Sequence, residues 1–276
     1  MDSRSAEGGH PAPSQRLLLD FAVEAAWQAG RITLEYFQTG AAVERKADAS
    51  PVTMADRRAE EKLRERIQHT FPEHGILGEE FGELTGRTPY RWILDPLDGT
   101  RSFIQGVPLY GVMVGLEYAG QAVLGVVHFP ALGDIIYAAK GEGCYWNGRR
   151  ARVSSVQQLD EAVVLATDVR TLYQQGRGPV FETLQTKTRL QRTWGDCYGH
   201  MLVATGRAEI MLDPILNIWD CAALQPILEE AGGTFTDWGG TATHAGGNGL
   251  STNGHLFQAV MEIIAAGQGP AFREEA

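Results

Sequence analysis

Two aspartates stand at the end of a short apolar run, and their types and spacing suit a divalent cation. Residues 92–94 (Trp-Ile-Leu) are typical of a buried strand, and Asp95 and Asp98 follow with Pro96 between them. Because proline has no N–H to donate, we expect the strand to end at Pro96 and to leave the carbonyl of Leu97 free. Mg²⁺ prefers hard oxygen ligands, so these groups predict a magnesium site. The alternative is an ordinary strand-to-turn junction with exposed aspartates.

A short helix is expected to begin at Gly99 and Thr100, directly after these acids. The first N–H groups of a helix have no partner within it, and they attract anions. We therefore expect a phosphate group to bind at this turn, beside the metal.

Three further acidic residues stand where they can join this site. Asp56 lies three residues after Thr53, as in a capping box at the start of a helix. Glu79 follows the apolar pair 76–77, whose short strand can end beside the strand of residues 92–94. Asp220 stands where an N-cap is expected. In the alternative interpretation Asp56 and Asp220 only cap helices, and Glu79 is a solvated surface residue.

Hydrophobic periodicity predicts the elements that position these residues. Helices are expected over 14–39 and 53–71, and an antiparallel β meander over 110–147. Strands and helices alternate after residue 153, which is typical of an α/β lobe.

The helix that begins at Asp220 is expected to end before Gly232, a glycine suited to a helix terminus. Pro226 lies inside it and predicts a bend, because proline removes one helical hydrogen bond.

We expect one domain over residues 14–266, with loose tails at 1–13 and 267–276. Within it, residues 14–152 would form a metal-binding β lobe with two N-terminal helices, and residues 153–266 an α/β substrate lobe.

Composition excludes several classes of protein. The 276 residues carry a net charge of −10, which disfavours nucleic-acid binding. The 3 cysteines have no paired spacing, so reduced thiols in the cytoplasm are expected rather than disulfides or a zinc site. No apolar stretch reaches the length of about 18 residues that suggests a membrane span.

Four motifs, in order, resemble those of the inositol monophosphatase-like phosphatases. They are PVTMAD (51–56), GEE (78–80), WILDPLDGT (92–100), and WD (219–220) with EAGG (230–233). The resemblance implies a five-layered α-β-α-β-α sandwich of the sugar phosphatase type, within the α/β class. It also implies a magnesium-dependent, lithium-sensitive phosphatase of small phosphate monoesters that forms a homodimer.

The resemblance also implies a role for each motif residue, with two or three Mg²⁺ ions in each active site. The first ion would be held by Glu79, Asp95 and the Leu97 carbonyl, the second by Asp95, Asp98 and Asp220, and an optional third would lie near Asp56. Thr100, paired with Asp56, would orient the attacking water and act with Glu79 in catalysis. The backbone N–H groups of Gly99 and Thr100 would bind the phosphate.

The second half of the chain departs from the inositol phosphatases at residues 193–200 and at Asp213, where those enzymes carry a glutamate. These segments resemble the histidinol-phosphate phosphatases of the family, which implies a role in histidine biosynthesis. L-Histidinol phosphate brings an ammonium and an imidazole, and a cation favours carboxylate partners. We expect the following residues to contact the substrate: Asp98, Gly195, Asp196, Asp213 and Asp220.

Trp194 or Tyr198 would stack on the substrate's ring or cation. In the alternative interpretation Asp196 caps the helix that follows it and Trp194 belongs to the core. The rival substrates are inositol 1-phosphate, other sugar phosphates such as fructose bisphosphate, and a 3′-phosphonucleotide, which is disfavoured because the sequence shows no base-binding insertion. A non-catalytic role beside RNA polymerase is disfavoured, because every motif acid is present.

Overall fold

The computed structural model describes residues 13–40, 43–45 and 51–267. The two expected tails, residues 1–13 and 267–276, lie outside the described residues except for Pro13 and Gly267. In the described part of the chain, no helix is long and apolar enough to cross a membrane.

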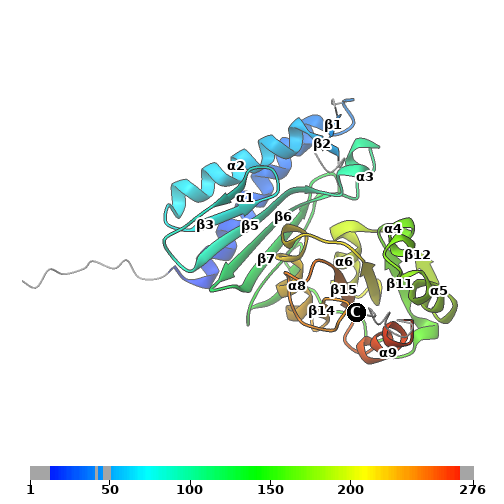
Figure 1. The fold of residues 1–276 in the computed structure, drawn as a ribbon. Coiled ribbons are helices and arrows are strands. Elements are labelled where there is room, and N and C mark those ends of the chain that lie inside the picture. Colours follow the sequence, from blue (N-terminus) through cyan, green and yellow to red (C-terminus); the bar gives the residue numbers. More distant parts are fainter. Residues whose placement is uncertain (1–12, 41–42, 46–50, 268–276) are drawn as a thin grey trace, which may run out of the picture.

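The helices and two main sheets stack in five layers (Figure 1), which confirms the expected α-β-α-β-α sandwich. The first layer is α1 (Gln15–Tyr36) and α2 (Met54–Thr70), whose apolar faces cover one side of the larger sheet. A two-stranded sheet, β1 (Val43–Arg45) and β2 (Pro51–Thr53), leads into α2.

The second layer is an eight-stranded sheet of order β10-β9-β8-β7-β6-β5-β3-β4, in which only β3 and β5 pair in parallel. Its strands are β3 (Gly75–Gly78), β4 (Gly82–Leu84), β5 (Tyr90–Asp98), β6 (Gly111–Tyr118), β7 (Gln121–Phe129), β8 (Asp134–Ala139), β9 (Gly143–Trp146) and β10 (Arg149–Arg150). Strands β6 to β9 form the expected meander.

The third layer lies between the two sheets and consists of α6 (Asp196–Ala204), α7 (Ile218–Cys221) and α8 (Leu224–Glu230). All three cysteines are buried and free, as expected for reduced core thiols.

The fourth layer is a five-stranded sheet of order β12-β11-β13-β15-β14. Its strands are β11 (Val163–Ala166), β12 (Leu190–Arg192), β13 (Ile210–Asp213), β14 (Thr234–Thr236) and β15 (Gly249–Thr252). The fifth layer covers its outer face with α4 (Val169–Gln174), α5 (Gly178–Lys187) and α9 (Phe257–Gly267). The short α3 (Thr100–Ile104) follows β5, and a 3₁₀ helix (Leu159–Glu161) precedes β11.

Two local expectations were wrong, one at Pro96 and one at the helix of Asp220. Strand β5 does not end at Pro96 but runs to Asp98, because the missing N–H falls in a bulge. Asp95 pairs with Met113 and Asp98 with Gly111, so β5 carries one residue more than β6 over this interval.

The helix expected from Asp220 is divided into α7 and α8, and Asp220 is not its N-cap. The N-cap is Asn217, and Asp220 occupies the third helical position of a capping box. Pro226 cannot donate a hydrogen bond to the carbonyl of Ala222, four residues earlier, so the interruption falls at 222–223 rather than at Pro226 itself.

A pair of glycines lets the junction of α7 and α8 approach the larger sheet. Gly115 on β6 lies opposite Gly125 on β7. A Cβ atom at Gly125 would lie 2.0 Å from the carbonyl oxygen of Ala223, and one at Gly115 would lie 2.8 Å from the Cβ of Ala222. These glycines therefore allow α7 to lie against β5 and β6, where it carries Asp220.

We predict that Gly125→Ala lowers the free energy of unfolding by about 2–4 kcal/mol, because the added methyl group must displace backbone atoms. The matched control is Gly148→Ala, where φ is +75° but no atom lies within 4 Å of the added Cβ. Its cost should be only about 1 kcal/mol of backbone strain. Urea unfolding measures the cost of each substitution. Equal costs would contradict the conclusion that the junction of α7 and α8 lies too close to Gly125 for a side chain there.

Candidate functional site

The parallel pairing of β3 and β5 brings two acidic residues together at the ends of these strands. Gly78 pairs with Leu94, and the N–H of Glu79 donates to the carbonyl oxygen of Leu94 at 3.2 Å. Glu79 and Asp95 therefore follow neighbouring strand positions, as the sequence predicted.

The turn after Glu79 is held by a buried glutamate that the sequence analysis did not identify. The Glu60 carboxylate accepts hydrogen bonds from the backbone N–H groups of Glu80 at 2.7 Å and Phe81 at 3.2 Å. Arg64, one helical turn further along α2, balances its charge at 2.6 Å. This contact fixes the backbone that carries Glu79 to helix α2.

The bulge in β5 turns the following groups toward the same place. An Asp95 oxygen accepts from the N–H of Leu97 at 2.9 Å, and the Leu97 carbonyl accepts from the Thr100 hydroxyl at 3.0 Å. Asp98 accepts from the N–H of Cys197 at 2.6 Å, so a side chain at the end of β5 also holds the start of α6.

Asp220 joins this group from a distant part of the sequence. Its carboxylate accepts from the N–H of Asn217 at 2.7 Å, and α7 contacts β5 and β6. One oxygen from each of Asp95, Asp98 and Asp220 lies within 4.8 Å of the others. These residues line a cavity of about 240 Å³. Its other lining residues are Glu79, Leu97, Gly99, Thr100, Arg101, Asp196 and Asn217.

The electrostatics of this cluster favour a cation. Burial raises the pKa of Asp98 to about 7, and the neighbouring charge of Asp220 adds to the rise. Burial likewise raises the pKa of Asp220 to about 7. Burial, Glu79 and Asp98 raise the pKa of Asp95. A divalent ion would remove this repulsion, and an all-oxygen donor set of carboxylates and one carbonyl suits Mg²⁺. The residues present therefore fit the expected metal.

Thr100 and Asp56 lie together beside this cluster. The Thr100 hydroxyl lies 3.4 Å from one Asp56 oxygen, and the other Asp56 oxygen accepts from the N–H and the hydroxyl of Thr53 at 2.8 and 2.7 Å. Asp56 therefore closes the predicted capping box of α2 and also contacts Thr100, so the two interpretations are compatible.

Gly99 precedes α3 in a left-handed conformation with φ of +83°. A Cβ atom there would lie 3.0 Å from the Leu109 carbonyl and 3.2 Å from a carboxylate oxygen of Asp196. Glycine is thus required both by the backbone and by the approach of Asp196.

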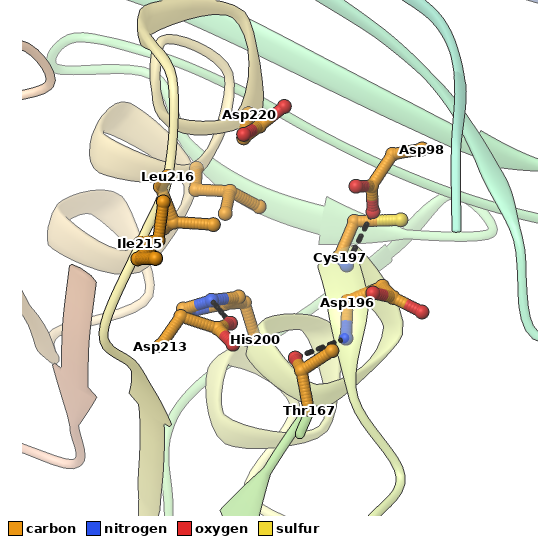
Figure 2. A pocket seen from close by; sticks show the side chains of 10 residues that line it. Asp98, Thr167, Asp196, Cys197, His200, Asp213, Ile215, Leu216 and Asp220 are labelled. Carbon is orange, nitrogen blue, oxygen red and sulfur yellow. Dashed lines mark hydrogen bonds and ion pairs between the residues drawn. The ribbon is translucent and has the colours of Figure 1, made fainter. Parts of the chain in front are cut away.

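A second cavity of about 150 Å³ shares Asp98, Asp196 and Asp220 with the first. Figure 2 shows Asp98 and Asp220 toward its top and the pair His200 and Asp213 below them. The remaining lining residues are Thr167, Cys197, Ile215, Leu216 and Leu224.

Asp196 is not a helix cap. The N-cap of α6 is Gly195, and Asp196 is the first helical residue, with a left-handed φ of +54°. Its N–H donates to the Thr167 hydroxyl at 2.8 Å. Burial, Asp98 and Asp213 raise the pKa of Asp196. A strained backbone that aims a carboxylate into a cavity is a common feature of binding sites.

The aromatic residues of this segment lie elsewhere. Trp194 is 42% exposed, so it does not belong to the core as the alternative interpretation had it. Tyr198 packs edge-on against Phe129, with ring centroids 5.5 Å apart, and lines neither cavity. Stacking of these rings on a substrate stays a prediction.

His200 is a cavity residue that the sequence analysis did not single out. It lies four residues after Asp196, a spacing that in a regular helix places two side chains on one face, and both residues line the second cavity. That spacing was the available signal. Its hydrogen bond to Asp213 joins residues of two elements and has no signature in the sequence.

The chain matches known proteins over nearly its whole length. Residues 14–268 match the model of the inositol monophosphatase family. The sequence is 45% identical to a histidinol-phosphatase of Chlorobaculum parvum, covering 91% of this chain and 97% of that protein. It is 36% identical to a histidinol-phosphatase of Mycobacterium tuberculosis, covering 82% and 88% of the two chains.

Solved structures agree with these matches. The extragenic suppressor protein suhB of Bartonella henselae superimposes with a TM-score of 0.85 at 28% identity, covering 92% of this chain and 99% of that one. The IMPase of Thermotoga maritima superimposes with a TM-score of 0.82 at 30% identity, covering 91% and 97%.

The raised carboxyl pKa values predict how the stability of the metal-free protein depends on pH. Below about pH 7 the folded protein retains protons on Asp98 and Asp220, whereas the unfolded chain releases them at its lower carboxyl pKa. The free energy of unfolding therefore falls as pH rises toward 7, and the stability that depends on these protons is lost above it. Between pH 6 and pH 8, each group should cost about 1 kcal/mol of unfolding free energy. Urea unfolding in a chelator measures this change. Saturating Mg²⁺ should abolish it, and a metal-free protein equally stable at both pH values would contradict the prediction.

Proposed function

The chain belongs to the inositol monophosphatase family, and from this premise we propose that it is a Mg²⁺-dependent phosphatase that hydrolyses L-histidinol phosphate to L-histidinol and phosphate. One observation carries the choice of substrate: two carboxylates, Asp196 and Asp213, line a cavity that shares Asp98 and Asp220 with the acidic cluster. A phosphate ester with an ammonium group could place its phosphate beside the acidic cluster and its ammonium group beside Asp196 and Asp213.

The metal ligands would be those that the family resemblance implies. Glu79, Asp95 and the Leu97 carbonyl would hold one ion, and Asp95, Asp98 and Asp220 a second. When bound, the ions would lower the pKa of a coordinated water and offset the charge of the phosphate oxygens. Asp56 contacts Thr100, which lines the same cavity, so Asp56 could contribute to this site or bind a third ion.

The protein's own groups would orient the reaction. The Thr100 hydroxyl donates to either the Leu97 carbonyl or the Asp56 carboxylate, so its lone pairs are free to accept a hydrogen bond from the attacking water. Such positioning contributes to catalysis by holding the water in line with the phosphorus atom. The N–H groups of Gly99 and Thr100 would bind the phosphate at the start of α3.

The similarity to histidinol-phosphatases supports this substrate. The second candidate is inositol 1-phosphate or a related sugar phosphate, and the similarity to the IMPase of Thermotoga maritima favours it. The homodimer, the lithium sensitivity and the cytoplasmic location stay predictions.

We predict that the enzyme prefers L-histidinol phosphate to inositol 1-phosphate by at least about tenfold in kcat/KM, because the ammonium group gains charge-assisted hydrogen bonds. Phosphate release from both esters with Mg²⁺, and with a chelator as the blank, measures the preference. A preference for inositol 1-phosphate would leave the phosphatase assignment intact but overturn the choice of substrate.

We further predict that Asp220→Asn lowers kcat/KM by more than about 100-fold, because even residues that only support metal ligands are worth 10–100-fold. The fold should persist, since the asparagine oxygen can still accept from the N–H of Asn217. The matched control is Asp160→Asn, which alters an exposed aspartate that lines neither cavity. Near-full activity of Asp220→Asn with an unchanged circular dichroism spectrum would exclude Asp220 as a metal ligand.

A further inference from the structure

His200 is a buried histidine with both ring nitrogens engaged. Its Nδ1 lies 2.7 Å from the Ser251 hydroxyl and its Nε2 lies 3.0 Å from one carboxylate oxygen, Oδ2, of Asp213. Only 1% of the His200 residue is exposed. The contact with Asp213 is visible in Figure 2.

The imidazole ring of His200 is held by residues of neighbouring strands. His200 comes from α6, Asp213 ends β13, and Ser251 lies on β15, which pairs with β13 in antiparallel register. The ring of Phe235 on β14 packs against the imidazole with centroids 5.7 Å apart. The ring therefore has a single orientation in which both hydrogen bonds form.

The direction of these hydrogen bonds follows from the partners. Asp213, when ionised, can only accept, so Nε2 of His200 must carry the proton that is shared with it. In the neutral ring Nδ1 then accepts from the Ser251 hydroxyl, and in the charged ring it donates. In either state Asp213 receives one hydrogen bond from His200.

The other carboxylate oxygen of Asp213, Oδ1, is left for a ligand. Among the described residues no side chain or backbone group hydrogen-bonds to Oδ1. The described polar atoms that lack a partner and are also fully enclosed do not include Oδ1, so this oxygen is accessible from the cavity. The backbone of Asp213 is held as well, because its carbonyl accepts from the Trp238 indole at 3.0 Å. Since Asp213 lines the second cavity, Oδ1 is the oxygen that a ligand there can reach.

We infer that His200 and Ser251 are positioning residues that aim the Asp213 carboxylate at the ammonium group of an amine-bearing phosphate monoester. The inference rests on the proposed function, because it assumes that the substrate carries a cation. It assigns one end of the substrate to each side of the cavity: the phosphate lies on the metal-binding side, marked by Asp98 and Asp220, and the ammonium group lies at Asp213.

The remaining walls agree with this orientation. Ile215, Leu216 and Leu224 give the cavity an apolar side, which suits the carbon skeleton between the two charged ends of such a substrate. A polyol would leave several hydroxyl groups without partners on this side, which costs binding energy.

Two substitutions of His200 separate the two hydrogen bonds. His200→Gln places an amide N–H near the position of Nε2 and can still donate to Asp213. His200→Asn places its amide near Nδ1, toward Ser251, and cannot reach Asp213. Ser251→Ala removes the other anchor of the ring. The matched control is His69→Asn, at an exposed histidine on α2.

The assay compares L-histidinol phosphate with the same ester lacking the amine, in the full-length enzyme with Mg²⁺. The quantity measured is the ratio of kcat/KM for the two esters. We expect His200→Asn to lower this ratio by about tenfold or more, mainly through KM for the amine-bearing ester, because a charge-assisted hydrogen bond is lost or misdirected. His200→Gln should retain most of the ratio, Ser251→Ala should lower it, and His69→Asn should leave it unchanged.

Each outcome decides one question. An unchanged ratio in His200→Asn, or equal losses on both esters, would mean that His200 only supports the fold and would overturn the inference. If His200→Asn does not fold, as judged by circular dichroism, the ratio in Ser251→Ala decides in the same way. A wild-type enzyme without preference for the amine-bearing ester would instead overturn the proposed substrate, so the two failures are distinguishable.

Discussion

The mutual repulsion of buried carboxylates is the constraint on which the rest of the structure depends. Asp95, Asp98 and Asp220 bring oxygens within 4.8 Å of one another, and because Asp95 is buried and the other two are only partly exposed, water screens their charges poorly. The pKa of Asp98 and that of Asp220 rise to about 7 as a result of burial and neighbouring charge. A fold that gathers such charges is less stable for it unless protons or a cation neutralise them. The arrangement therefore favours a cation-binding site.

The fold holds these acids by hydrogen bonds to the backbone rather than by cationic side chains. The N–H groups of Leu97, Cys197 and Asn217 donate to the three aspartates, and each belongs to a bulge or the start of a helix. Because these donors are neutral, they orient the carboxylates without removing their charge, which stays available to a metal. The paired glycines Gly115 and Gly125 serve the same end, since they let α7 reach the sheet.

Local sequence patterns predicted the features whose causes are local. The capping box of Thr53 and Asp56, the strand before Asp95 and the β meander were all confirmed. The proximity of Glu79 and Asp95 was also expected, because their strands follow closely in the sequence, and β3 and β5 do pair with each other. The errors at Pro96 and Asp220 arose where two local solutions compete: proline can end a strand or sit in a bulge, and an aspartate can cap a helix or close a capping box at its third position. Sheet pairing and tertiary contacts decide between them.

The contacts of His200 show why the rest was not accessible from sequence. His200, Asp213 and Ser251 lie on α6, β13 and β15, and only the antiparallel pairing of β13 with β15 brings them together. The acidic cluster, in contrast, is assembled mainly from one bulged strand and its neighbours. Chemistry common to a family can thus be read from compact motifs, whereas selectivity depends on packing between layers. Two enzymes with the same acids would accept different esters if their α6 presented another residue to the end of β13.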